Sequence, residues 1–243
     1  MIRRCTIRKY AVLLATLICP LAFAQRFSDF VTHTPLPAGS TLVIGFLGGY
    51  ERWNDEHRSV RRLTLRLRRR AGVYAESISN HNRKLALKLI RRALDTNRNG
   101  QLDPAEKAAA RIILFGQSWG GAAVVDTAGD LEGLGIPVLL TVQVDSVGIN
   151  DAVIPANVRA AVNFYQHDPL TIQGREEIRA ADPARTTILG NFRESYVNRS
   201  IDESNASWPR RVLGGSHNKM EVDPDLWSRV EQYISDAIAR REP

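Results

Sequence analysis

The stretch that decides the fold reads IILFGQSWGG and spans residues 112–121. Its first four residues are apolar without alternation, a pattern typical of a strand that is buried on both faces of a sheet. A serine, Ser118, then stands between Gly116 and Gly120, and small residues from Gly121 onward open a helix. The Gly-x-Ser-x-Gly pattern between a strand and a helix is typical of a sharp turn that exposes the serine hydroxyl above the sheet. The sequence therefore predicts that Ser118 is a nucleophile.

Strands and helices alternate on both sides of this stretch. Apolar and β-branched runs predict six strands, at residues 41–44, 73–78, 112–115, 138–144, 160–165 and 186–189. The spacing of apolar residues predicts helices around residues 60–67, at 81–94, at 121–131, and after the capping residue Asp223. Buried strands that alternate with helices form mostly parallel sheets covered on both faces. We therefore expect a single α/β domain over residues 25–243.

The serine turn and the order of elements resemble the α/β-hydrolase superfamily. In that superfamily the chain order is nucleophile, acid, histidine, and the imidazole takes the serine proton. Three of the five histidines precede Ser118, namely His33, His57 and His81. Of the other two, His217 lies in a glycine-bearing loop just before the terminal helix, where the superfamily places its base, whereas His167 ends the fifth strand. The resemblance thus implies that His217 is the base.

Two aspartates compete for the role of the acid that orients the imidazole. Asp168 follows the fifth strand, which is the commoner position in the superfamily. Asp145 ends a more strongly apolar strand, and its Asp-Ser-Val-Gly run resembles the Asp-Thr-Val-Gly run of certain bacterial phospholipase effectors with this fold. We favour Asp145 and keep Asp168 as the alternative.

A serine hydrolase also needs N–H donors for the oxyanion of its tetrahedral intermediate. The resemblance implies that one donor is the backbone N–H of Trp119, the residue after the nucleophile. The other should come from the loop after the first strand, residues 45–49, which resembles the lipase-type His-Gly loop with Gly45 in place of the histidine. Aligning the loops favours the N–H of Leu47, with Gly48 close behind.

Residues 95–106 match the calcium loop of an EF-hand. Oxygen-bearing ligands fall at loop positions 1, 3, 5, 7, 9 and 12, and these are Asp95, Asn97, Asn99, Gln101 through its carbonyl, Asp103 and Glu106. The turn glycine, Gly100, stands at position 6. A single loop of this kind is more typical of a structural ion than of a sensor, so the sequence predicts one bound Ca²⁺ that braces the fold.

The first 24 residues have the pattern of a secretory signal peptide. Basic residues precede an apolar run, residues 10–23, that ends in Ala-Phe-Ala. This pattern predicts that the protein is secreted or periplasmic. Both cysteines, Cys5 and Cys19, lie in this segment, so the mature chain is expected to have none. Removing the four basic residues of the segment leaves 29 Lys+Arg against 26 Asp+Glu, which lowers the net charge from +7 to +3. This modest charge argues against nucleic acid as a partner.

Seven arginines between Arg58 and Arg70 surround an apolar stripe. We interpret them as the solvated face of an amphipathic helix, with peripheral contact to anionic lipid or envelope polymer as the alternative.

These observations predict an exported serine hydrolase that cleaves an ester or thioester, as a lipase, esterase or cutinase does, through an acyl-enzyme on Ser118. A lipid, a polyester and a small acyl ester are all admissible substrates. Two alternatives remain: a calcium-dependent binding or envelope protein that keeps the fold without its chemistry, and a serine peptidase on the same fold. A distance beyond about 5 Å between the Ser118 and His217 side chains would favour the binding protein.

Overall fold

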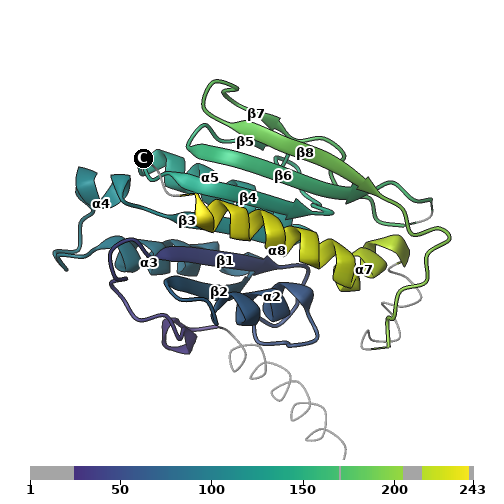
Figure 1. Cartoon of the computed structure of the whole chain (residues 1–243), viewed down its shortest axis with the longest axis horizontal. Coiled ribbons are helices and arrows are strands. Elements are labelled where there is room, and N and C mark those ends of the chain that lie inside the picture. Colours follow the sequence, from purple (N-terminus) through teal and green to yellow (C-terminus); the bar gives the residue numbers. More distant parts are fainter. Residues whose placement is uncertain (1–24, 170, 205–214, 241–243) are drawn as a thin grey trace, which may run out of the picture.

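The computed structural model describes residues 25–169, 171–204 and 215–240, so the predicted signal peptide lies outside the described residues. Its centre is a six-stranded sheet in the order β2-β1-β3-β4-β6-β8, in which every neighbouring pair is parallel (Figure 1). The strands are β1 (Thr41–Leu47), β2 (Val73–Ser79), β3 (Ile112–Gln117), β4 (Val138–Val144), β6 (Val158–Gln166) and β8 (Thr187–Glu194). A second, two-stranded sheet pairs β5 (Val153–Ile154) with β7 (Arg179–Ala180).

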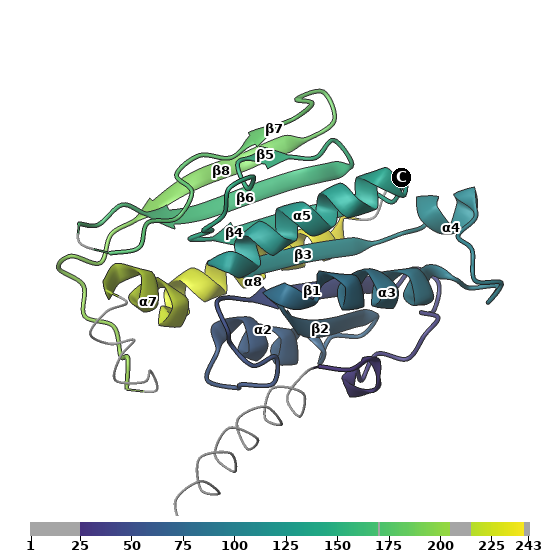
Figure 2. The same cartoon turned by 180° about the vertical axis from the view of Figure 1, so that it is seen from behind.

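Helices cover both faces of the large sheet (Figures 1 and 2). One face carries α3 (Arg83–Leu94) and α5 (Trp119–Gly133), and the other carries α2 (Ser59–Leu67), α7 (Gly215–Val222) and α8 (Pro224–Ala239). Shorter helical turns are η2 (Phe27–Asp29), η3 (Asn80–Asn82) and α4 (Pro104–Ala108). The predicted single α/β domain, with its mostly parallel sheet and helices on both faces, is confirmed.

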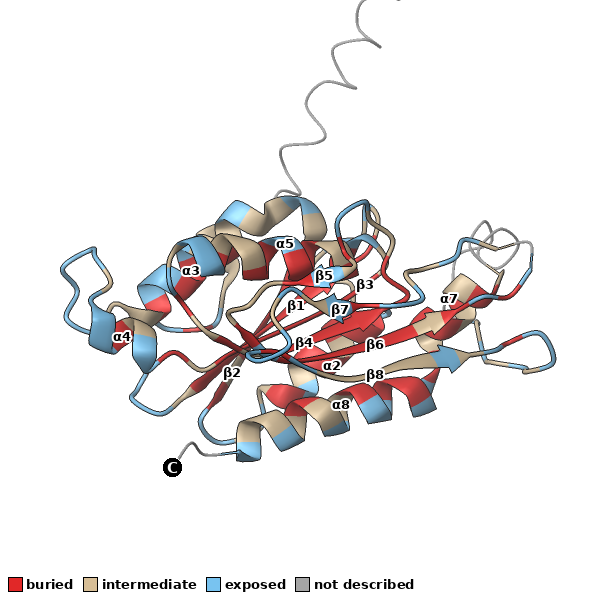
Figure 3. Cartoon of the chain, turned by 90° about the horizontal axis from the view of Figure 1, so that it is seen from above, coloured by how far each residue is buried: buried red, intermediate tan, exposed pale blue. Residues whose placement is uncertain are grey.

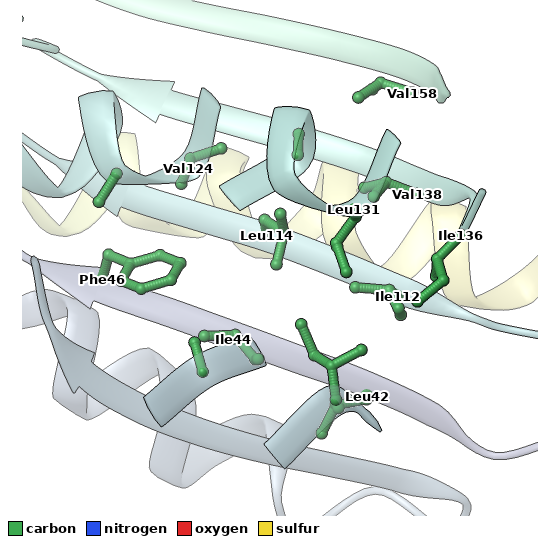
Figure 4. Close-up of a cluster of buried hydrophobic side chains, with 14 of the residues drawn as sticks. Leu42, Ile44, Phe46, Ile112, Leu114, Val124, Leu131, Ile136, Val138 and Val158 are labelled. Carbon is green, nitrogen blue, oxygen red and sulfur yellow. The ribbon is translucent and has the colours of Figure 1, made fainter. Parts of the chain in front are cut away.

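The core consists of two apolar layers, one on each side of the sheet, because successive strand residues point to opposite faces. Leu42, Ile44 and Phe46 of β1 pack toward α3 and α5 together with Ile112 and Leu114 of β3 (Figure 4). The alternate residues of the same strands pack toward α2 and α8. Figure 3 shows that buried residues run the length of the central strands, whereas exposed residues lie mainly on the outer helix faces and the loops. The unalternated apolar pattern of the strands thus reflects burial on both faces.

The basic stretch 58–70 is less solvated than we expected. Its helix, α2, does bury the predicted apolar stripe of Val60, Leu63 and Leu67. However, Arg66 and Arg70 both form ion pairs with Glu231 of α8. Further ion pairs join Arg68 to Glu76 of β2 and Arg58 to Glu221 of α7. Much of the positive charge of this stretch therefore ties α2 to its neighbours.

The helix α7 was not predicted, because its sequence suggested a glycine-bearing loop. Met220 is its one buried large apolar residue, so apolar periodicity gives no signal. Polar contacts hold it instead: the Ser216 hydroxyl donates to Asp168, and the Lys219 ammonium donates to the carbonyls of Tyr196 and Arg199. These contacts fix a helix whose first turn carries His217.

The strand order places the ends of β1 and β3 at the point where the topology reverses. From β1 the chain passes to β2 on one side of the sheet, and then returns to β3 on the other side. In open parallel sheets, ligands bind outside the carboxyl ends of the strands at such a switch point. The loop after β1 and the turn after β3 are therefore the places to look for a site. None of the helices in the described part of the chain has the length and apolar character needed to cross a membrane.

Candidate active site

Ser118 occupies a strained turn between β3 and α5. Its φ of 55° and ψ of −126° lie in a region that non-glycine residues rarely adopt. Glycines on both sides allow this turn because the backbone passes very close to its neighbours. A Cβ on Gly116 would lie 2.3 Å from the carbonyl oxygen of Gly120, and a Cβ on Gly120 would lie 2.1 Å from that of Phe46. The predicted turn is thus present, with the serine at the carboxyl end of the strand.

Three predicted residues from distant parts of the chain meet at this turn. The Nε2 atom of His217 lies 3.1 Å from the Oγ atom of Ser118, and its Nδ1 atom lies 2.6 Å from Oδ2 of Asp145. The Asp145 side chain is fully buried and that of His217 is mostly buried. If Nδ1–H donates to the carboxylate, Nε2 presents its lone pair to the serine hydroxyl, which is the tautomer that a general base needs.

Asp145 is held from several sides. Its Oδ1 atom accepts the backbone N–H of Gly174 at 3.0 Å and that of Gln166 at 3.3 Å. The side-chain amide of Gln166 donates to Oδ2 at 3.0 Å, beside the imidazole. Like Ser118, Asp145 has a positive φ, 43°, at the carboxyl end of its strand. These contacts fix the carboxylate, and the sequence analysis did not identify Gln166 or Gly174 as its partners.

The alternative acid, Asp168, does not contact the imidazole. It accepts hydrogen bonds from the Ser195 hydroxyl, the Tyr196 backbone N–H and the Ser216 hydroxyl. Burial alone would raise the pKa of Asp168, but the hydrogen bonds from Ser216, Tyr196 and Ser195 hold that pKa below its ordinary value. Asp168 therefore anchors the residue next to His217 instead of orienting the imidazole. The other late histidine, His167, pairs with Glu176 at 2.5 Å.

The loop after β1 lies against Ser118, as the oxyanion-hole prediction requires. A Cβ on Gly48 would lie 3.1 Å from the Cβ of Ser118, a contact so tight that a larger residue would have to push its neighbours aside. The side chain of Asn80 donates to the carbonyl oxygens of Leu47 and Gly49, at 2.9 and 2.6 Å, and so fixes the loop. Gly48 is thus a close neighbour of Ser118, while the N–H groups of Leu47 and Trp119 remain the predicted donors.

Gln117 is a site residue that the sequence analysis missed. Its side-chain amide lies 3.3 Å from Nε2 of His217, and its Oε1 atom occupies the space that a Cβ on Gly48 would need. It stands immediately before Ser118, so its place in the motif was the signal that could have identified it. The Gln117 amide group contacts His217 on one side and the loop after β1 on the other.

The predicted calcium loop lies at the opposite end of the sheet from Ser118. It joins α3 to α4, beside the amino ends of the strands, whereas α7 lies at the carboxyl ends (Figures 1 and 2). An ion in this loop would therefore lie too far from Ser118 to contact it.

The side-chain oxygens of this loop are hydrogen-bonded to its own backbone. Asp95 accepts the N–H groups of Asn99 and Gly100, and Glu106 accepts those of Thr96, Asn97 and Asp103. Among the described residues, no group of three or more His, Cys, Asp or Glu side chains is arranged to hold a metal ion. The donors are nevertheless the hard oxygens that Ca²⁺ prefers. The Oε1 atom of Glu106 already accepts three hydrogen bonds, from the N–H and hydroxyl of Thr96 and from the N–H of Asn97, so it would have to release some of them to bind an ion. The donor chemistry fits calcium, although the three carboxylates are not gathered.

Neither a protein-family model nor a curated protein matches this sequence. Among solved structures, a cutinase-like protein from Cryptococcus sp. is 13% identical, with a TM-score of 0.46, over 87% of this chain and 100% of that chain. The RedJ thioesterase from the prodiginine biosynthetic pathway of Streptomyces coelicolor is 13% identical, with a TM-score of 0.42, over 88% and 100%. Human thioesterase 2 is 10% identical, with a TM-score of 0.38, over 82% and 96%.

Proposed function

We propose that this protein is a serine hydrolase that cleaves an ester or thioester. The observation that carries the proposal is the convergence of Ser118, His217 and Asp145, three residues widely separated along the chain, at the strained turn after β3. The 3.1 Å separation of Ser118 Oγ and His217 Nε2 favours the enzyme over a binding protein that keeps only the fold, for which side chains beyond about 5 Å would be expected.

The arrangement suits acyl transfer in two steps. Nε2 of His217 takes the hydroxyl proton as Ser118 Oγ attacks the carbonyl carbon, and Asp145 stabilises the imidazolium that forms. The N–H groups of Trp119 and the loop after β1 receive the negative charge of the tetrahedral intermediate. The imidazolium then protonates the leaving oxygen or sulfur, which leaves an acyl group on Ser118. Water activated by the same imidazole releases that group as the acid.

A covalent probe tests the proposed nucleophile. A fluorophosphonate should react with the purified protein at Ser118, because the probe needs a serine oxygen activated by a neighbouring base. Mass spectrometry of the digested protein should place the adduct on the peptide that contains Ser118. Absence of labelling, or labelling at another serine, would contradict the proposed function.

We further propose that the protein is exported, to the periplasm or the medium, and that the loop 95–106 binds one calcium ion. Residues 1–24 support export through their signal-peptide pattern. The spacing of oxygen donors supports calcium at Asp95, Asn97, Asn99, Gln101, Asp103 and Glu106. Because Asp95 and Glu106 already bond to backbone N–H groups, we expect an affinity as modest as that of extracellular modules, about 10⁻⁴ to 10⁻³ M.

Calcium should stabilise the fold without changing the chemistry. At a free concentration one hundred times Kd, binding to the native state alone adds about 2.7 kcal/mol to the free energy of unfolding. For a chain of this size that corresponds to a melting temperature about 5–10 °C higher. Thermal unfolding with chelator, and then with excess calcium, should show this fall and recovery.

Two variants sharpen this measurement. Glu106→Gln removes a carboxylate from loop position 12 and should blunt the calcium response. Glu132→Gln, an exposed change on α5, should leave the response intact. A melting temperature that is the same in chelator and in saturating calcium would show that the loop is a metal-free turn.

A further inference from the structure

Three aromatic rings form a cluster beside the nucleophile. Tyr50 follows β1, His81 belongs to the turn η3 after β2, and Trp119 begins α5 after β3. The ring centroid of Tyr50 lies 5.1 Å from that of His81 and 5.6 Å from that of Trp119, and those of His81 and Trp119 are 6.2 Å apart. The aromatic cluster, as we call these three residues, therefore gathers at the carboxyl edge of the sheet, next to Ser118.

The cluster is exposed to solvent. Tyr50 is 85% exposed and Trp119 is 41% exposed, and neither residue belongs to the two apolar layers of the core. Leaving so much apolar surface in water contributes little to folding, because the hydrophobic gain comes from removing that surface from water. Exposed apolar patches of this kind commonly mark binding sites. Packing within the fold does not explain the cluster.

The backbone under the cluster is held in place. Asn80, which precedes His81, donates hydrogen bonds to the carbonyls of Leu47 and Gly49, and Gly49 immediately precedes Tyr50. Trp119 is fixed by its position in the first turn of α5. The rings are thus carried on elements that also position the nucleophile and the loop after β1, as a substrate-binding surface requires.

The sheet order places the cluster and the acid on opposite flanks of Ser118. β1 and β2 lie on one side of β3, and β4, which ends at Asp145, lies on the other. The imidazole that contacts Asp145 must protonate the leaving group, so the leaving group belongs on the flank of His217 and Asp145. The acyl group then extends away from that flank, toward the loop after β1 and the aromatic cluster.

We propose that the aromatic cluster is the acyl-binding subsite of the enzyme and that it favours aromatic acyl groups over short aliphatic ones. This inference rests on the proposed function. Aromatic rings attract one another in offset-stacked and edge-to-face arrangements beyond the effect of buried area. The exposed ring of Tyr50, which already meets Trp119 edge to face, offers such contacts to an aryl group carried by the acyl carbon.

The experiment compares two esters that share a leaving group, 4-nitrophenyl benzoate and 4-nitrophenyl acetate. Tyr50→Ala should lower kcat/KM for the benzoate about tenfold, mainly through KM, and should change the acetate less than about twofold. Tyr50→Phe keeps the ring and should behave as wild type with both esters. Because Tyr50 is exposed, neither variant should unfold, which their melting temperatures will check.

Each other outcome has a distinct meaning. An equal loss with both esters would show that the ring contacts the shared nitrophenyl leaving group or acts on the site generally, and would overturn the acyl assignment. No loss with either ester would overturn the subsite altogether. If wild type is labelled at Ser118 by the fluorophosphonate and hydrolyses both esters, such results contradict the inference alone. If wild type is neither labelled nor active, the proposed function fails and the subsite fails with it.

Discussion

Ser118→Ala is expected to lower ester hydrolysis at least a hundredfold while the melting temperature changes by no more than about 1 °C. The substitution removes the atom that attacks the carbonyl carbon, so only the slow catalysis by oxyanion stabilisation and binding remains. Stability should persist because alanine, like serine, is a non-glycine residue at the same φ of 55°, and only one partly exposed hydroxyl is lost. Initial rates with a 4-nitrophenyl ester and a thermal unfolding curve measure both quantities.

A second serine provides the control. Ser228 lies on the exposed side of α8, where its hydroxyl donates to the carbonyl of Pro224. Ser228→Ala should retain both turnover and fluorophosphonate labelling. If Ser118→Ala kept more than one hundredth of the wild-type rate, Ser118 would no longer be a candidate nucleophile.

Asp145→Asn is expected to lower kcat by several orders of magnitude, on the order of 10⁴ in a well-studied triad. The asparagine keeps the size of the side chain, but its amide group can donate to Nδ1 of His217 and stabilise the tautomer in which Nε2 carries the proton. Such an imidazole cannot accept the proton of Ser118. Steady-state kinetics with a small ester should show the loss in kcat, and the circular dichroism spectrum should remain that of the wild type.

Asp168→Asn is the matched variant. It should retain kcat within about tenfold, because Asp168 contacts Ser216 and not the imidazole. Its cost should appear in stability, about 1–3 kcal/mol, since a charged acceptor of three hydrogen bonds, two of them buried, is lost. Because the pKa of Asp168 is held below its ordinary value, its stabilising contribution is present above about pH 4 and is lost as the pH falls through the folded-state pKa. If Asp168→Asn were crippled and Asp145→Asn active, the assignment of the acid would be reversed.

The residues around two strand ends were enough to identify Ser118 and Asp145 from the sequence. The glycines around Ser118 are demanded by close backbone approach, and Asp145 directly follows a buried apolar strand. Each of these features involves only a few consecutive residues, so each can be recognised as a sequence pattern. The fold class was predictable for the same reason, because each strand of a doubly covered sheet carries its own apolar run.

The parts that the sequence did not reveal depend on long-range polar contacts. The sequence favoured Asp145 over Asp168 but could not decide between them, because the choice depends on contacts across the fold: Ser216 donates to Asp168, and the imidazole meets Asp145. The helix α7 itself is held by side chains from other segments and carries no apolar stripe. Gln166 and Tyr50 acquire their places in the same way, through neighbours distant in sequence.

The all-parallel sheet also suggests that the active site assembles late in folding. A parallel pair cannot close as a local hairpin, so every neighbouring pair in this sheet waits for a long crossover of the chain. The nucleophile and the imidazole are 99 residues apart, and the imidazole and Asp145 are 72 apart. A nascent or partly folded chain therefore has the serine without its base. If the enzyme is exported as we propose, its chain should stay inactive in the cell that makes it until α7 has docked and brought His217 to Ser118.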